Sequence, residues 1–272
     1  MKYMHFNSSC SYAGMANMLK LLDYDTEDYK IALDMGLPFF ARCEMGKYYQ
    51  PGAMLQSKEW FNLYLKPRGF CYIEKTIYKH EVIGNLRPGI MLGINVNQQS
   101  KHAIVFIKEV NGVYIFLNNK WEESLDEESF EFTKDEFLKR IPEKVVVGYI
   151  EKCNVEKLEV IPYYKESINT WRQLKEEINQ FTLREQSIHK LQESMNRLFR
   201  PLLVDGLAMM KLLEKQELVE SLEKLQGNFL NAVKKNKQIT LAKEFDCSKF
   251  DIVIDKIIDL IENKMNTLEL TH

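Results

Sequence analysis

The stretch His102-Ala-Ile-Val-Phe-Ile-Lys-Glu-Val-Asn-Gly-Val-Tyr-Ile-Phe-Leu-Asn-Asn-Lys-Trp121 has the pattern of two strands joined by a tight turn. Aliphatic and aromatic residues fill both halves, and Asn111-Gly112 separates them. A two-residue type I′ turn needs positive φ at both central positions, which Asn and Gly adopt most easily. The stretch therefore predicts a β-hairpin, with His102 at the start of its first strand.

The register of this hairpin decides which of two asparagines faces His102. If the turn is tight and the strands are regular, Asn119 lies opposite Ile104. Side chains alternate between the two faces of a strand, so Asn119 would then share the face of His102 while Asn118 points away. A β-bulge or a longer turn reverses the assignment. Asn118, sixteen positions after His102, would then share the face of His102. The regular register favours Asn119, with Asn118 as the alternative.

Further hydrophobic stretches around the hairpin complete an antiparallel sheet. Aromatic and β-branched residues punctuated by Gly, Pro and Asn predict strands over 89–95, 102–108, 113–117 and 145–150. The helical spacing of apolar residues predicts helices over 10–22 and 52–64. These elements define an α+β domain over residues 1–160.

From Pro162 onward, Leu, Glu, Lys and Gln dominate and the apolar periodicity is helical. Helices are predicted over 167–199, from Pro201, over 217–233 and over 250–265. Pro201 should mark a break between two helices, because its ring fits the first turn of a helix but not the interior. Residues 161–272 are therefore predicted to form an all-helical domain, either a cap on the first domain or the contact surface of a homodimer.

Size and composition limit the classes of function. The chain has 272 residues and a formal net charge of −2, whereas nucleic-acid binding normally needs a strongly basic face. It contains no uninterrupted apolar stretch long enough to span a membrane, and its first residues lack the apolar core of a secretory signal. We therefore expect a cytoplasmic protein that binds neither nucleic acid nor membrane.

One cysteine has a setting unlike the others. The five are scattered, odd in number and without a C-x-x-C pair, which argues against a disulfide framework and a zinc site; we expect no metal and no cofactor. Cys10 lies within Ser8-Ser9-Cys10-Ser11, where the first helix should begin and where Ser8 or Ser9 could cap it. A thiol there feels the positive end of the helix dipole, which lowers its pKa. Cys10 is the predicted nucleophile.

A thiolate nucleophile needs an imidazole partner, and the imidazole needs an orienting group. His102 is the best placed of the five histidines, because it opens a hydrophobic strand beside a polar loop. The predicted catalytic set is Cys10, His102 and Asn119, with Asn118 as the alternative. In the regular register Trp121 shares the His102 face, where it would shield the His–Asn contact from water and border the substrate.

The order Cys, His and Asn, together with the His-hairpin-Asn-x-Trp pattern, resembles the papain-like cysteine peptidase clan over residues 1–160. The compact bacterial branch is most similar. It includes the double-glycine leader peptidases, the N-terminal domain of the butirosin-pathway acyltransferase, and papain-like enzymes of nonribosomal thioamide antibiotic assembly. The resemblance implies a papain-like domain with cysteine chemistry. Such enzymes usually carry a Gln six residues before the cysteine as oxyanion donor; this chain has Met4, so Asn7 or His5 is expected to substitute.

The expected activity is acyl transfer through a Cys10 thioester, forming amide bonds in specialised peptide or natural-product biosynthesis. The choice of transfer over hydrolysis rests on analogy with the butirosin-type proteins. The expected partner is a peptide or acyl-thioester substrate, with a carrier-protein thioester as the first donor to test. Basic residues of the helical half would dock that carrier or simply form a solvated face: Arg184, Lys190, Arg197 and Arg200. The alternatives are a cysteine peptidase hydrolysing a peptide or leader sequence, and a non-enzymatic binding protein.

Overall fold

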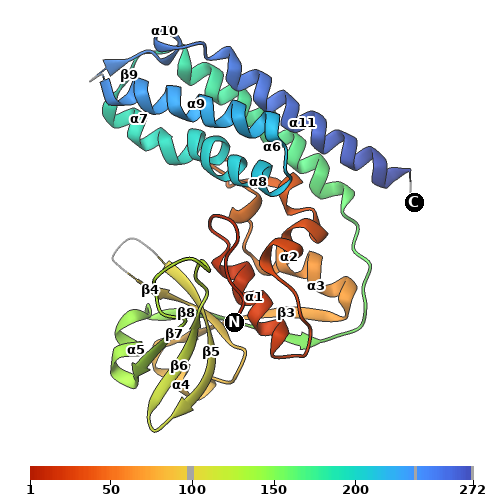
Figure 1. Cartoon of the computed structure of the whole chain (residues 1–272), viewed down its shortest axis with the longest axis vertical. Coiled ribbons are helices and arrows are strands. Elements are labelled where there is room, and N and C mark those ends of the chain that lie inside the picture. Colours follow the sequence, from red (N-terminus) through yellow and green to blue (C-terminus); the bar gives the residue numbers. More distant parts are fainter. Residues whose placement is uncertain (97–100, 236–237, 271–272) are drawn as a thin grey trace. The chain divides into compact units, whose positions relative to one another are not determined.

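The computed structural model describes residues 1–96, 101–235 and 238–270 and divides into two compact units (Figure 1). The first unit consists of Met1–Met35 and Gln56–Leu158, and the second of Gly36–Leu55 and Glu159–His272. The fold is mixed α+β with an antiparallel sheet, as predicted. The division differs from the expected domains 1–160 and 161–272 mainly because the segment 36–55 belongs with the helices.

The first unit is built on a six-stranded antiparallel sheet with strand order β3-β8-β4-β5-β6-β7. Four strands confirm the predicted ones: β4 (Met91–Asn95), β5 (Lys101–Val110), β6 (Val113–Asn118) and β8 (Lys144–Lys152). The sequence analysis missed β3 (Phe70–Tyr78) and β7 (Ser129–Thr133). The helices of this unit are α1 (Cys10–Lys20), α2 (Asp28–Met35), α3 (Lys58–Leu65), α4 (Val82–Asn85) and α5 (Lys134–Arg140).

The two faces of this sheet carry different residues. Along β4, Leu92 and Ile94 point into a core that also contains Phe116 and Phe137. The alternate residue Met91 points to the opposite face, where it lies against Gly14 of α1. Since side chains alternate along a strand, this second face is the one on which α1 is packed.

The hairpin between β5 and β6 has the predicted turn but not the predicted register. Asn111 and Gly112 have φ values of 51° and 79°, as a type I′ turn requires. Between Phe106 and Lys108 the pairing shifts by one residue, so Ile104 lies opposite Asn118. The prediction that Asn119 lies opposite Ile104 is therefore wrong, because a β-bulge changes the face of every later residue on β6.

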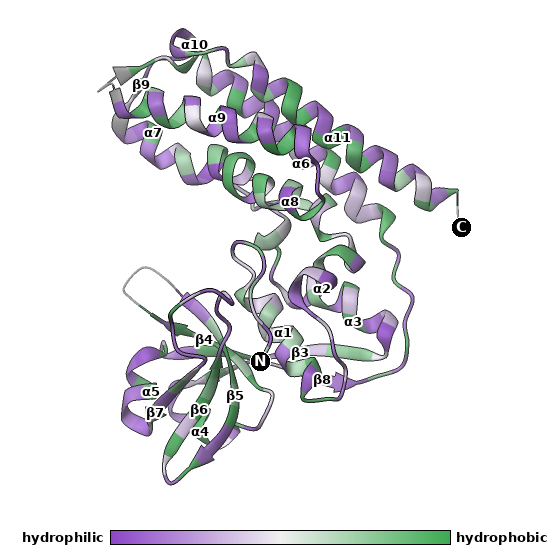
Figure 2. Cartoon of the chain, viewed as in Figure 1, coloured by the Kyte–Doolittle hydropathy of each residue, from purple (hydrophilic) through white to green (hydrophobic). Residues whose placement is uncertain are grey.

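The second unit is mostly helical, but it also contains strands. Its main helices are α6 (Ile161–Thr182), α7 (Ile188–Ser194), α8 (Leu207–Leu212), α9 (Gln216–Lys235) and α11 (Ser248–Glu269), with the short α10 (Leu241–Glu244). Within residues 161–272, the pairing of β9 (Gln186–Ser187) with β10 (Gln238–Ile239) corrects the all-helical prediction. The pair β1 (Ala41–Glu44) and β2 (Tyr48–Pro51) joins this unit from the segment 36–55. Figure 2 shows hydrophobic and hydrophilic residues alternating along α9 and α11, as expected for helices buried on one side.

The helix breaks of this unit also differ from the prediction. The expected helix over 167–199 ends at Thr182, whereas no break occurs at Pro201. The chain passes through Pro201 in two π-helical segments, Met195–Phe199 and Pro201–Gly206. Proline donates no backbone hydrogen bond in either kind of turn, but the wider π turn leaves room for its ring, which in an α-helix clashes with the carbonyl four residues back. The segment 52–64, predicted as one helix, is a 3₁₀ turn (Gly52–Met54) followed by α3.

No helix within residues 1–96, 101–235 and 238–270 has the length and apolar character needed to cross a membrane.

One acidic side chain in the π-helical stretch is buried without full hydrogen bonding. Asp205 is 2% exposed, and its Oδ1 atom has no hydrogen-bond partner among the described residues. The Arg200 Nε atom lies 3.4 Å from Oδ2. Burial raises the pKa of Asp205 to about 6, against the opposing charge of Arg200. A buried carboxylate with one unsatisfied oxygen destabilises the folded state when it is ionised.

Replacing Asp205 should therefore stabilise the helical unit in a pH-dependent way. The pKa of Asp205 in the folded state lies above the ordinary value of 3.8, so the free energy of unfolding falls as the pH rises from about 4 to about 6. Asp205→Asn should raise the free energy of unfolding by on the order of 2 kcal/mol at pH 7 and by much less at pH 4. Urea denaturation at both pH values measures this. Asp259→Asn, at an exposed position of α11, is the control, and an equal gain at both pH values would contradict the prediction.

Candidate active site

Cys10 is the first residue of α1, as predicted. The first hydrogen bond of the helix runs from the Ala13 N–H to the Ser9 carbonyl at 2.8 Å. Cys10 therefore lies at the positive end of the helix, where the N–H groups of the first turn have no partner within the helix. The predicted serine cap is absent, because Ser9 does not cap the helix and its hydroxyl donates instead to Asp28 Oδ2 at 2.8 Å.

Asp28 anchors the segment that leads into α1. Its buried carboxylate accepts the Ser9 hydroxyl and the His5 backbone N–H, the latter at 2.8 Å. The His5 ring Nδ1 lies 2.5 Å from Asp28 Oδ1. His5, one of the two predicted oxyanion donors, is thus held by Asp28. The other, Asn7, is exposed in the turn before Cys10.

His102 lies near the start of β5, and its ring Nε2 is 2.8 Å from Asn118 Oδ1 on the neighbouring strand. The Asn118 side-chain N–H₂ donates to the Glu127 carbonyl at 2.7 Å. Because that carbonyl can only accept, the Asn118 amide must present its oxygen to His102. His102 Nε2 then carries the proton, which leaves Nδ1 for Cys10, and the two side chains share a hydrogen bond. The structure brings Cys10, His102 and Asn118 together.

Asn119 has a different set of contacts. It is fully buried, donates to the Ala103 carbonyl at 2.9 Å and accepts from the Asn17 side chain at 3.0 Å. Asn17 in turn accepts the Lys2 backbone N–H at 2.7 Å. Asn119 therefore connects α1 to β5 and does not orient His102, because the bulge in β5 turns it to the opposite face.

The charges of Cys10 and His102 depend on each other. Burial by itself would raise the pKa of Cys10, but the hydrogen bond and charge of His102, the Ala103 backbone N–H and the Ser11 hydroxyl together hold it below its usual value. Burial would lower the pKa of His102, yet the hydrogen bonds with Cys10 and Asn118 and the charges of Cys10 and Asp126 raise it. Opposite shifts of this kind favour a thiolate–imidazolium pair.

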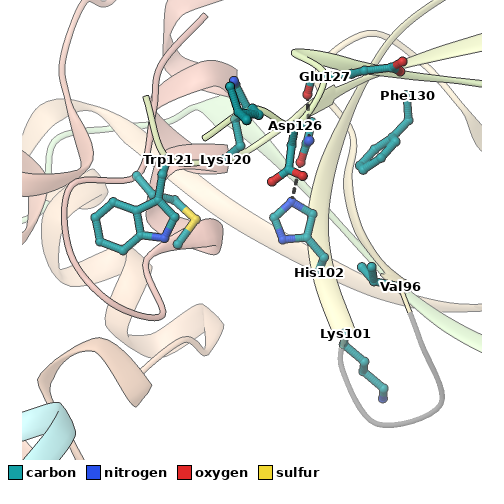
Figure 3. A pocket seen from close by; sticks show the side chains of 11 residues that line it. Val96, Lys101, His102, Lys120, Trp121, Asp126, Glu127 and Phe130 are labelled. Atoms are coloured by element: carbon teal, nitrogen blue, oxygen red, sulfur yellow. Dashed lines mark hydrogen bonds between the residues drawn. The ribbon is translucent and has the colours of Figure 1, made fainter. Parts of the chain in front are cut away.

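Two cavities border His102. The smaller, of about 220 Å³, also contains Cys10. The larger, of about 600 Å³, is lined by Asn118, Met4 and Trp121 as well. Figure 3 shows Trp121 across this space from the imidazole, with the Asp126 carboxylate beside His102. Trp121, predicted to border the substrate, is 42% exposed there.

Sequence reasoning missed three residues of the site. Gln56 lines the Cys10 cavity, donates to the Ser8 carbonyl at 2.6 Å and accepts from the Ser11 hydroxyl at 2.9 Å. Asp126 lies in the larger cavity, and Gly93 in the smaller one. Gln56 and Asp126 lie in loops without periodicity, so no local pattern marks them. Gly93 could have been noticed as a glycine within a strand, where close approach of another group is a common reason.

Two of the basic residues considered for carrier docking have partners within the helical unit. Arg197 pairs with Glu177 and donates to the Lys47 carbonyl at 3.0 Å, and Arg200 lies beside Asp205. Arg197 and Arg200 are therefore paired with acidic residues of their own unit, which leaves less positive charge for docking a carrier protein.

No protein-family model matches the chain, and no curated protein sequence is significantly similar to it.

Cys10 should be the most reactive thiol of the chain near neutral pH. The thiolate is the species that reacts, so a raised pKa makes a cysteine less reactive. Burial raises the pKa of Cys43 and Cys71, and it raises the pKa of Cys247 to about 11. At pH 7 iodoacetamide should modify Cys10 at least roughly tenfold faster than Cys43 or Cys71. This advantage should persist at lower pH until the depressed pKa of Cys10 is reached. Peptide mapping by mass spectrometry measures the rates; equal labelling of the three cysteines would contradict the ion pair.

The two neighbouring asparagines should give separable effects. Asn118→Ala removes a hydrogen bond that favours the imidazolium, so the pH at which Cys10 becomes reactive should rise. Asn119→Ala leaves that contact in place but exposes unpaired groups in the core, which should cost about 1–3 kcal/mol of stability. Alkylation rates across pH and thermal melting distinguish the variants. The assignment would be overturned if Asn119→Ala shifted the pH profile and Asn118→Ala did not.

Proposed function

We propose that this protein is a papain-like cysteine enzyme that transfers an acyl group through a Cys10 thioester. The observation that carries the proposal is the contact between Cys10 at the head of a helix and His102 on a strand, with Asn118 on the next strand bonded to the imidazole. Hydrogen bonds thus connect a nucleophile, Cys10, to a base, His102, and connect that base to an orienting group, Asn118. Their order along the chain is also that of papain-like enzymes.

In the proposed reaction the Cys10 thiolate attacks a thioester or amide carbonyl. The His102 imidazolium gives its proton to the leaving group, and the acyl group stays on the Cys10 sulfur. Neutral His102 then accepts a proton from an amine that attacks this thioester. Collapse of the intermediate expels Cys10 as thiolate and restores the ion pair. Asn118 keeps Nε2 protonated throughout, so Nδ1 is the atom that exchanges protons.

Negative charge on the carbonyl oxygen needs donors near the sulfur. The backbone N–H of Cys10, at the start of α1, supplies one in this proposal. Gln56 supplies the second, because its side-chain amide lines the Cys10 cavity while Met4 borders the other one. Asn7, the expected donor, is exposed in the preceding turn and has the weaker position.

The cavity of about 600 Å³ beside His102 supports transfer to a second substrate. Its volume falls within the range that holds small molecules, and it borders the same imidazole as the Cys10 cavity.

A cysteine peptidase is the competing function, since the two cavities could hold the two sides of a peptide bond. In the transfer proposal the donor is an acyl thioester, carried by a carrier protein in specialised peptide biosynthesis, and the protein acts in the cytoplasm. The helical unit then serves as a cap or as a homodimer contact.

Intact-protein mass spectrometry with acyl thioesters tests the proposal. The wild-type chain should gain the mass of one acyl group, Cys10→Ala should gain none, and Cys71→Ala should behave like the wild type. Added amines should remove the adduct and yield an amide. Cleavage of peptides without any use of an amine would favour the peptidase, and an adduct that persists in Cys10→Ala would exclude Cys10 as the nucleophile.

A further inference from the structure

The small cavity beside Cys10 lies against a part of the sheet where the residues facing it have no side chain or only a methyl group. In β4 and β5, Gly93 lies opposite Ala103, the residue that follows His102. Gly93 points to the same face as Met91, toward α1 and away from the core formed by Leu92 and Ile94. The floor of the cavity is therefore nearly bare backbone, directly beside the proposed nucleophile.

Gly93 differs from Gly148, the other glycine in the described strands of this sheet, in having free space above it. A Cβ atom placed on Gly93 meets nothing within 4 Å among the described residues. A Cβ on Gly148 would lie 1.7 Å from the Tyr72 hydroxyl, so that glycine is needed for packing. Gly93 has no such packing reason, and its φ is not in the left-handed range that favours glycine. A glycine in a strand costs stability, which makes the empty space the feature to explain.

Apart from Ser11 and Gln56 beside Cys10, most of the residues that line this space are apolar, and its aromatic residues are held in place. Phe61 and Tyr72 form an edge-to-face pair with ring centroids 4.9 Å apart. The Asn62 side chain fixes the Tyr72 backbone with two hydrogen bonds, of 2.7 Å to its N–H and 3.2 Å to its carbonyl. Met91 and Val146 complete the walls. The only charged residues that line the cavity in the described part of the chain are His102 itself and Lys101, which is exposed.

We propose that this cavity binds the acyl group of the donor, and that Gly93 sets its depth, so that the enzyme selects short, uncharged, apolar acyl groups. This inference rests on the proposed Cys10 thioester. The cavity of about 220 Å³ is smaller than the ~300–1,000 Å³ of typical ligand sites, which limits the length of the chain. The apolar walls disfavour a carboxylate, because it would lose its hydration there, and Lys101, the cationic side chain that lines the cavity beside His102, is exposed and screened by solvent.

The covalent step that this cavity would serve exchanges one thioester for another. The Cys10 thiolate displaces the thiolate of the donor: a C–S bond forms at Cys10, the donor C–S bond breaks, and the His102 proton passes to the departing sulfur. The R group of the acyl chain lies over Gly93 while the carbonyl remains at the head of α1. A side chain at position 93 would occupy the space of the R group without touching either sulfur.

N-Acetylcysteamine thioesters of graded length test the inference on the full chain. Butyryl and hexanoyl donors should acylate Cys10 about tenfold faster than decanoyl or succinyl donors, as measured by the rate of adduct formation in intact-protein mass spectrometry. Gly93→Val should slow butyryl and hexanoyl acylation about tenfold or more, while acetyl transfer and iodoacetamide labelling stay within about twofold. Valine is favourable in a strand, so the loss would not come from unfolding.

Two further variants complete the design. Gly84→Ala is the matched control, because a Cβ there also meets nothing within 4 Å among the described residues but the residue lies in α4, outside the cavity. It should leave every rate unchanged. Val146→Ala, at a wall residue that is 52% exposed, should raise the decanoyl rate relative to the hexanoyl rate.

The possible results distinguish a failure of the acyl-cavity proposal from a failure of the proposed Cys10 chemistry. Equal acylation by all donors, a preference for succinyl, or a Gly93→Val variant with unchanged chain-length selectivity would overturn the acyl cavity while leaving Cys10 as the nucleophile. Slowing of all reagents by Gly93→Val, iodoacetamide included, would also overturn it, since the effect would lie on the thiol. If no thioester acylates Cys10 although iodoacetamide does, the proposed function fails and the cavity assignment fails with it.

Discussion

Helix α1 lies so close to the sheet that only glycine fits at position 14. A Cβ atom there would lie 2.5 Å from Met91 Sδ and 2.7 Å from Asn119 Nδ2. Cys10 lies one helical turn before Gly14 and on the same side of the helix. The close approach at Gly14 therefore sets the position of the sulfur over β5, beside Ala103 and His102. Asn119 and Asn17 secure the approach with hydrogen bonds between helix and strand.

Asn118, the last residue of β6, and Asn119, the residue after it, point to opposite faces of the sheet, which explains why sequence reasoning found the right segment but chose the wrong residue. The Asn111-Gly112 turn and the hydrophobic strands were predictable, because turn chemistry and alternation are local signals. The bulge between Phe106 and Lys108 was not, since one extra apolar residue leaves no mark in a continuous hydrophobic run. A shift of one residue exchanges the faces. Asn118 thus reaches His102, and Asn119 fastens the helix that carries Cys10.

The second unit shows the same limit of local reasoning. Helical periodicity correctly indicated a helical region, but proline alone did not indicate a break. Pro201 lies within π-helical turns, which are wide enough to keep its ring from the carbonyl four residues back. Strand β1 pairs with β2 and joins this unit although it precedes the whole six-stranded sheet in sequence. Such an assignment depends on contacts between distant segments, here the Ala41 N–H with the Ser167 hydroxyl at 2.8 Å, which no short window of sequence contains.

The coupling between Cys10 and His102 determines at which stage of the proposed reaction His102 acts as an acid and at which stage it acts as a base. Burial opposes charge on both groups, so each is charged mainly because the other is. Acylation of Cys10 removes the thiolate, and with it the strongest support for the imidazolium. Asn118 and the exposed Asp126 remain, but they are the lesser contributions to the raised pKa of His102. The pKa of His102 should therefore fall once the thioester forms. The imidazole becomes a base at the stage when an incoming amine must lose a proton, and expulsion of the Cys10 thiolate recharges the pair.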